Sequence, residues 1–104
     1  MKNLFQKIID KEEPAEFLYE DDEYIIINNK FPKTPIHYLI IPKRAIHSIS
    51  EATEDDRDIL GGLLLLAKKF AERKNIKDYK LVFNTGKHLH TPHLHLHFLA
   101  GNIE

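Results

Sequence analysis

The chain has 104 residues and a formal net charge of −1, from 15 Lys and Arg against 16 Asp and Glu. This length fits one domain, 1–104, and the charge balance excludes a nucleic-acid binder that relies on overall basicity. The absence of cysteine excludes disulfides, thiolate zinc sites and cysteine nucleophiles. No apolar run reaches the ~20 residues that cross a bilayer, and the first seven residues lack a secretory signal, so we expect a cytoplasmic protein without membrane contacts.

The first half of the chain predicts one short helix and three strands. Apolar residues at helical spacing indicate a helix over 3–11, with Asn3 as its N-cap. A loop with two prolines, at 29–35, separates the second strand from the third. The three strands are expected at 15–20, 24–28 and 37–41.

The second half predicts one long helix between strands. Thr53 and the acids after it form a helix start, and an apolar stripe continues over 57–73. Gly61 and Gly62 inside this helix each cost roughly 1 kcal/mol relative to Ala, which indicates either a close backbone approach or a weak surface helix. With two further strands at 79–83 and 93–99, the pattern predicts an α+β domain of five strands and two helices.

Histidine is unusually frequent in this chain, with seven among 104 residues, and five of the seven lie between His88 and His97. In a strand, alternate side chains point to opposite faces, so His93, His95 and His97 are expected to share one face. Leu94, Leu96 and Phe98 would share the other face and anchor the strand to the core. Polar residues on a solvated sheet face would explain one histidine, but three in register favour a chemical role.

Metal binding is one chemistry that such a row allows. His-x-His on a strand offers two zinc ligands, but His93 and His97 would lie about 13 Å apart at ~3.3 Å per residue. A third ligand would have to come from His37, His90 or elsewhere, and no Glu-x-x-His or Cys pair completes the set. A zinc site is therefore an incomplete but open interpretation.

Nucleophilic catalysis at phosphorus is the second chemistry. A neutral imidazole, with a reference pKa near 6.5, attacks without help from a thiol or an activated serine. Flanking histidines can donate hydrogen bonds to phosphate oxygens and transfer protons. The sequence has no Walker-type Gly-Lys loop, so the histidines themselves would supply the electrostatics.

The run His93-Leu94-His95-Leu96-His97-Phe98-Leu99 resembles the signature of the histidine triad (HIT) superfamily. Blocks at 5–15, 19–22 and 35–43 are similar to its Hint branch, the nucleoside phosphoramidases, and the similarity extends over residues 4–101. The resemblance implies a five-stranded antiparallel sheet with two helices, in a homodimer that shares a ten-stranded sheet. The long helix would then lie near the two-fold axis.

The resemblance also implies roles for single residues. His95 matches the nucleophile, which forms a nucleotidyl–imidazole intermediate, and His93 matches the first triad member, whose carbonyl holds the other ring nitrogen of the nucleophile. His97 matches the member that contacts the α-phosphate, His37 a fourth histidine that supports the first, and Asn84 a polar residue near the scissile bond. Four residues match the apolar walls of the nucleobase slot, although core packing explains them equally well: Leu4, Phe5, Ile8 and Ile27.

Several positions depart from the family pattern at the nucleotide. Asn29 stands where an Asp usually binds the ribose hydroxyls, and a neutral amide loses the charge-assisted share of that bond. Ile27 replaces a common aromatic residue, and the segment 87–92 before the triad is shortened. His90 in that segment stands where a hydroxyl usually reaches the phosphate. Two interpretations stay open: His90 is a fifth imidazole of the site, or it is a histidine of the loop without a catalytic role.

Two departures lie away from the triad. Many bacterial relatives bind structural zinc, but Asn3, Gln6 and Ala45 replace its ligands here, so we expect no such metal. The chain ends at 102–104 without the tail that usually shapes the leaving-group side of the site, which puts the leaving-group preference in question.

These observations together predict a hydrolase that needs no metal or other cofactor and cleaves nucleoside 5′-phosphoramidates or acyl-adenylates, with adenosine as the expected nucleoside. The expected partners are AMP derivatives and a second copy of the chain. Two alternatives stay open: a nucleotide-binding module with little catalysis, and a zinc-binding hydrolase.

Overall fold

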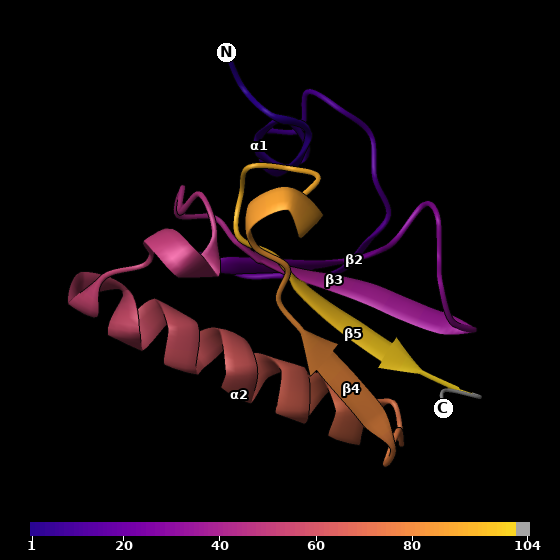
Figure 1. The fold of residues 1–104 in the computed structure, drawn as a ribbon. Coiled ribbons are helices and arrows are strands. Elements are labelled where there is room, and N and C mark those ends of the chain that lie inside the picture. The colour runs from indigo at the N-terminus through magenta and orange to yellow at the C-terminus, as the bar shows by residue number, and fades with distance from the viewer. Residues whose placement is uncertain (102–104) are drawn as a thin grey trace.

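The computed structural model describes residues 1–101, in which five antiparallel strands form one sheet in the order β1-β2-β3-β5-β4 (Figure 1). The chain end at 102–104, on which the expectation about a missing tail rests, lies outside the described residues. The strands are β1 (Phe17–Glu20), β2 (Tyr24–Asn28), β3 (Ile36–Pro42), β4 (Tyr79–Val82) and β5 (Leu96–Ala100). The helices are α1 (Leu4–Ile9) and α2 (Arg57–Arg73), with three 3-10 turns at Ile49–Glu51, Glu54–Asp56 and Gly86–His88.

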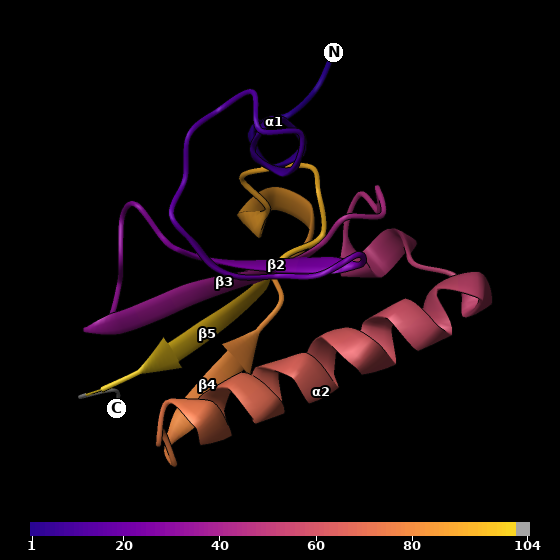
Figure 2. The ribbon, with the colours of Figure 1, turned by 180° about the vertical axis from the view of Figure 1, so that it is seen from behind.

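The two α-helices lie on opposite faces of the sheet (Figures 1 and 2). α2 packs on the face that carries Ile26, Ile40 and Phe98, and this side holds the larger apolar core. α1 packs through Phe5 and Ile8 on the other face, against a smaller cluster. The alternation along β2 and β3 thus gives each helix its own apolar surface, and the α+β fold with an antiparallel sheet is confirmed.

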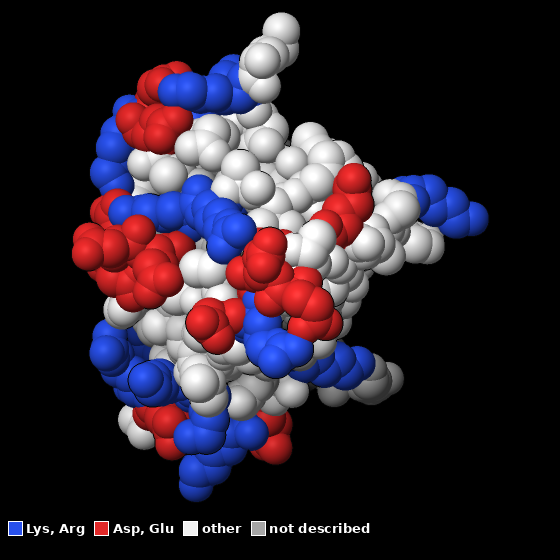
Figure 3. All heavy atoms as spheres, turned by 90° about the vertical axis from the view of Figure 1, so that its left-hand side faces the viewer, with Lys and Arg blue, Asp and Glu red and all other residues white. Residues whose placement is uncertain are grey.

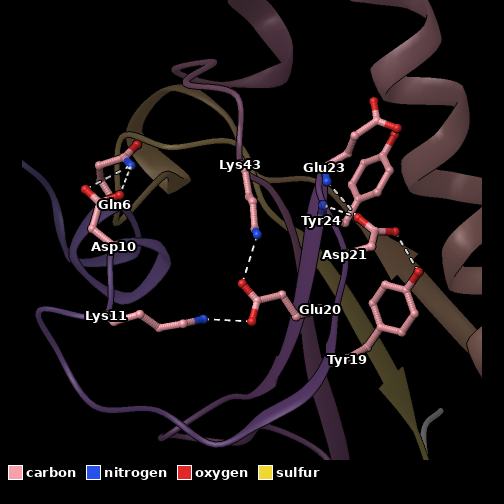
Figure 4. A network of polar contacts seen from close by, with 9 residues as sticks. All are labelled: Gln6, Asp10, Lys11, Tyr19, Glu20, Asp21, Glu23, Tyr24 and Lys43. Carbon is pink, nitrogen blue, oxygen red and sulfur yellow. Dashed lines mark hydrogen bonds and ion pairs between the residues drawn. The ribbon is translucent and has the colours of Figure 1, made fainter.

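The helix α1 is shorter than expected. Its N-cap is confirmed, because the Asn3 side chain accepts a hydrogen bond from the Gln6 amide at 2.9 Å. The helix ends at Ile9, and Lys11 turns the chain with a φ of 63°. Glu20 then accepts hydrogen bonds from both Lys11 and Lys43, at 2.7 and 2.8 Å (Figure 4). These contacts hold the segment after α1 against the end of β1.

The long helix α2 begins as expected. Thr53 and Asp56 form a capping box around the 3-10 turn that precedes it. Of the two glycines, Gly62 makes a close approach, because a Cβ atom there would lie 2.2 Å from the hydroxyl of Tyr24. That hydroxyl donates to the Ile59 carbonyl at 2.8 Å. Gly61 faces open space.

The last strand begins later than the sequence predicts, at Leu96 rather than at His93. Its partner β3 ends at Pro42, and the extended segment before β5 bonds outside the ladder, with the Leu94 amide donating to the Ile46 carbonyl. Only His97 of the triad therefore lies within the regular strand. No helix among residues 1–101 is long and apolar enough to span a bilayer.

Candidate active site

His95 stands on the α1 face of the sheet with its two ring nitrogens in different surroundings. Its Nδ1 lies 2.7 Å from the His93 carbonyl, and since a carbonyl only accepts, Nδ1 carries the proton. The ring packs edge-on against Phe5, with centroids 4.8 Å apart. Its Nε2 forms no hydrogen bond with any group of residues 1–101. Every buried side-chain N or O atom in this range has a hydrogen-bond partner, so Nε2 is not buried and its lone pair reaches solvent.

His97 is held by His37 rather than by the other triad members. The Lys33 amide donates to His37 Nδ1 at 3.0 Å, which leaves the His37 proton on Nε2. His37 Nε2 lies 2.9 Å from His97 Nδ1, so His37 donates and His97 accepts. His97 therefore carries its own proton on Nε2, beside the terminal amide of Asn84 at 3.2 Å. A donor on Nε2 suits an anionic oxygen.

His93 is a structural support, buried to 1% exposure. Its Nε2 donates to the Pro42 carbonyl at 2.8 Å, and its own carbonyl accepts from His95, the contact that the resemblance implies. The expectation that His37 supports His93 is wrong, because His37 bonds to His97. The register of β3 against β5 explains why His37 meets His97. His37 pairs with Leu99 and His97 pairs with Leu39, so the two rings are diagonal neighbours on the two strands.

The remaining polar candidates lie around this group. The Asn29 side chain is turned toward the protein: its Oδ1 accepts from the Phe31 amide at 3.0 Å and its Nδ2 lies 3.2 Å from His37 Nε2. His90 is exposed on the loop before the triad, yet its charge is near enough to lower the pKa of His95 and His97.

The four apolar candidates divide into two groups. Phe5, Ile8 and Ile27 are buried in the cluster under α1, where they pack with Leu39 and two other β-strand residues. Leu4, on the same helix, is 48% exposed. The buried cluster thus packs next to the His95 ring through Phe5, and Leu4 is the one of these four side chains that is exposed to solvent.

Burial keeps the histidines of this site neutral. Desolvation lowers the pKa of His37, with a contribution from the charge of Lys33, and desolvation also lowers the pKa of His93 and His95. The pKa of His97 falls to about 4, first because of burial and then because a second positive charge is disfavoured near His95, His37, Lys33 and His90. At neutral pH the His95 lone pair is therefore available.

Residues 1–101 contain no group of three His, Cys, Asp or Glu side chains arranged to hold a metal ion. Of the three positions expected to have lost structural zinc ligands, Asn3 caps α1 and also donates to the Pro92 carbonyl at 3.3 Å.

A family model with the description "Scavenger mRNA decapping enzyme C-term binding" matches residues 2–104. An uncharacterized HIT-like protein of Synechocystis sp. is 43% identical over 101 residues, which cover 94% of this chain and 89% of that protein. This chain belongs to the HIT superfamily.

Solved HIT structures share the fold closely. A HIT family hydrolase from Legionella pneumophila has a TM-score of 0.91 at 36% identity, over 98% of this HIT chain and 95% of the other. A histidine triad nucleotide-binding protein from Candida albicans has a TM-score of 0.83 at 25% identity, over 93% and 73% of the two chains.

Two hydrogen-bonding partners of the HIT site histidines were not predicted from the sequence. The Pro42 carbonyl and the Lys33 amide fix His93 and His37, and both act through the main chain. Main-chain groups leave no residue-type signal, although Pro42 lies in a block that the resemblance had singled out.

Proposed function

We propose that this HIT protein hydrolyses nucleoside 5′-phosphate derivatives, adenosine phosphoramidates or acyl-adenylates, through a nucleotidyl–histidine intermediate. The observation that carries this proposal is the His95 ring, whose Nδ1 proton is fixed on the His93 carbonyl while its Nε2 lone pair reaches solvent. A nucleophile needs such a free, neutral nitrogen held in one tautomer. The names of the related proteins, a hydrolase and a nucleotide-binding protein, agree with the proposed reaction class.

In this mechanism His95 Nε2 attacks the α-phosphorus and expels the leaving group, and water then releases the nucleotide. His97 Nε2–H donates to a phosphate oxygen, and Asn84 lies on the same side. A preorganised donor of this kind is worth roughly 10²–10³-fold in rate. In this proposal the reaction needs no metal ion or other cofactor beyond the four imidazoles of His37, His93, His95 and His97.

The nucleoside would lie along α1. Leu4 is exposed at the edge of the apolar cluster that holds Phe5, Ile8 and Ile27, and these four residues would contact the base. The Asn29 amide would meet the ribose hydroxyls, once its contact with His37 is exchanged for the sugar. His90 would approach from the loop before the triad.

The test is incubation with an adenosine phosphoramidate and with an acyl-adenylate. We expect AMP as product and, after rapid quenching, protein heavier by one adenylyl group. H95A should lose both signals, whereas H47A should keep them, because the exposed His47 forms its ion pair with Glu51 and not with a residue of the site. AMP binding by calorimetry without turnover would instead identify a binding module, and undiminished turnover in H95A would refute the nucleophile.

We also propose a homodimer that joins two sheets at β4. This strand is an edge of the sheet, and an unpaired edge readily accepts another strand. Leu64, Leu65 and Leu81 near this edge are 43%, 56% and 36% exposed. Light scattering should give twice the chain mass, and L65E should shift the particle toward the monomer. A monomeric wild-type particle at micromolar concentration would contradict the proposal.

A further inference from the structure

The nucleophile of the proposed reaction lies just outside the regular sheet. The strand β5 and its ladder with β3 begin one residue after His95. The main chain before β5 is held by the Leu94 amide, which donates to the Ile46 carbonyl at 2.6 Å, and by the His93 ring, which donates to the Pro42 carbonyl at 2.8 Å. These contacts fix the backbone of the segment, but they do not fix the plane of the His95 ring.

The His95 ring itself is held by one hydrogen bond and two neighbouring rings. Its Nδ1 donates to the His93 carbonyl, and a single bond of this kind leaves a ring able to swing about it. The Phe5 ring lies 4.8 Å from the His95 ring at 68°, and the His97 ring lies 4.9 Å away at 65°. Both are edge arrangements that aromatic pairs prefer. Because a phenyl ring has no hydrogen-bond donor, Phe5 restricts the imidazole without occupying its Nε2 lone pair.

Phe5 is itself fixed in place by the helix α1. The N-cap residue Asn3 donates from its side chain to the Pro92 carbonyl at 3.3 Å, so the start of α1 is joined to the segment that leads into the triad. The Phe5 side chain is only 6% exposed, whereas its neighbour Leu4 is 48% exposed. Most of the Phe5 surface is therefore used inside the protein, against His95 and the apolar cluster.

The charged side chains around α1 pair with one another. Lys2 forms ion pairs with Asp10 and Glu12. Figure 3 shows charged side chains gathered beside the N-terminal end of the chain, with an uncharged surface next to them. Through Phe5, the helix thus presents an apolar ring to the nucleophile rather than a charge or a competing donor.

We propose that Phe5 is a positioning residue, whose ring holds the His95 imidazole in the plane from which Nε2 attacks the α-phosphorus. This inference rests on the proposed function and deepens it. Phe5 acts on the nucleophile, so its effect on the rate is the same whatever base the substrate carries. A residue that served only as a wall of the nucleobase slot would act on the base alone.

Two substrates distinguish these roles. One is an adenosine 5′-phosphoramidate, and the other is the same phosphoramidate of a ribose that carries hydrogen in place of the base. F5L keeps an apolar side chain in the cluster but removes the ring. We expect F5L to lower kcat/KM roughly tenfold for both substrates, since a 1 Å misplacement of reacting groups can cost ~10²-fold. A loss confined to the adenosine substrate, or no loss, would overturn the inference.

L4A is the comparison variant for contact with the base. Leu4 precedes Phe5 on α1 and is exposed to solvent. L4A should lower kcat/KM more for the adenosine substrate than for the substrate without a base, whereas F5L should leave the ratio of the two values unchanged.

The His95 ring can also be observed without any substrate, through an NMR titration of its ring shifts. Burial is the main cause that lowers the pKa of His95. In F5L water reaches the ring more easily, so the pKa of His95 should rise toward its ordinary value. The titratable groups around the ring are His93, His90 and His97, and F5L leaves all three in the chain.

I25V is the matched control for a loss of packing. Ile25 is fully buried in the same cluster as Phe5, but it lies on β2, which β3 separates from β5. I25V should lower the free energy of unfolding, as F5L does, and leave the pKa of His95 and both kcat/KM values unchanged. If F5L changes the pKa of His95 and the two kcat/KM values no more than I25V does, Phe5 is a packing residue and the inference is refuted.

The outcomes separate the two proposals. If the wild-type protein hydrolyses the substrates through His95 and F5L behaves like I25V, the proposed function stands and the role of Phe5 is refuted. If no substrate is hydrolysed and no adenylyl adduct forms, the proposed function is wrong, and the titration of His95 in F5L still decides whether Phe5 fixes the ring.

Discussion

The His37–His97 contact makes a specific prediction about a single proton. Without the donor on His37 Nε2, His97 is free to move its proton to Nδ1, and its Nε2 then no longer donates to phosphate. H37A should therefore lower kcat/KM by up to roughly 10²-fold. H37Q, whose side-chain amide can still donate, should recover part of that loss. The ring ¹⁵N shifts of His97 report its tautomer directly.

A merely structural role for His37 would give a different result. In that case H37A would lower the free energy of unfolding but leave the His97 tautomer unchanged, and H37Q would rescue no activity. H47A serves as the control, because His47 is exposed and pairs with Glu51 rather than with either ring.

At the residue scale the sequence predicts which side chains belong to the site, but not which of them meet or how they are fixed. Alternation and the triad motif point to His95 and His97, because side-chain type and spacing carry that information. The pairing of His37 with His97 depends on the register of β3 against β5, and the tautomers depend on two main-chain groups. Neither is encoded in the identity of a residue.

Among the elements, α2 contains the sharpest packing constraint. G62A places a Cβ atom against Tyr24, whose ring is buried and whose hydroxyl is bonded to the Ile59 carbonyl. Overpacking of this kind costs about 1–3 kcal/mol, against roughly 1 kcal/mol gained in helix propensity. We expect net destabilisation in urea unfolding. In the Y24F background the hydroxyl is absent and the nearest ring atom would lie 3.1 Å from the Cβ atom, so the same substitution should destabilise less. Equal effects in both backgrounds would contradict this account.

Element positions are predicted well where the local signal is strong. Asn3 and Thr53 start their helices as expected, since capping is a local interaction. The ends are predicted less well: α1 stops early, at Ile9, before Lys11 turns the chain, and β5 starts late at Leu96, after its partner has ended at Pro42. The choice between close approach and a weak helix at Gly62 needed the position of Tyr24, far away in sequence.

For the molecule as a whole, the buried histidines predict a dependence of stability on pH. Their pKa values are lowered in the folded state, so between pH 6.5 and about 4 the unfolded chain binds protons that the folded chain does not. The free energy of unfolding should therefore fall as pH is lowered through this window. At ~1.4 kcal/mol per pKa unit, His97 contributes at most about 3 kcal/mol, and less because it is partly exposed.

Urea unfolding at several pH values measures this effect. H97Q should reduce the slope of stability against pH between 6.5 and 4, whereas H47Q should not. A wild-type stability that stays constant across this window would show that folding does not lower the pKa of these rings.

The loop that carries Lys33 also presents Phe31 to solvent, with 82% of its surface exposed. The chain contains no tryptophan. An indole introduced by F31W would thus be a unique optical reporter in the loop whose Lys33 amide contacts His37, at an exposed position where no packing is disturbed. Its emission could follow the arrival and departure of nucleotide in real time, with unmodified substrates.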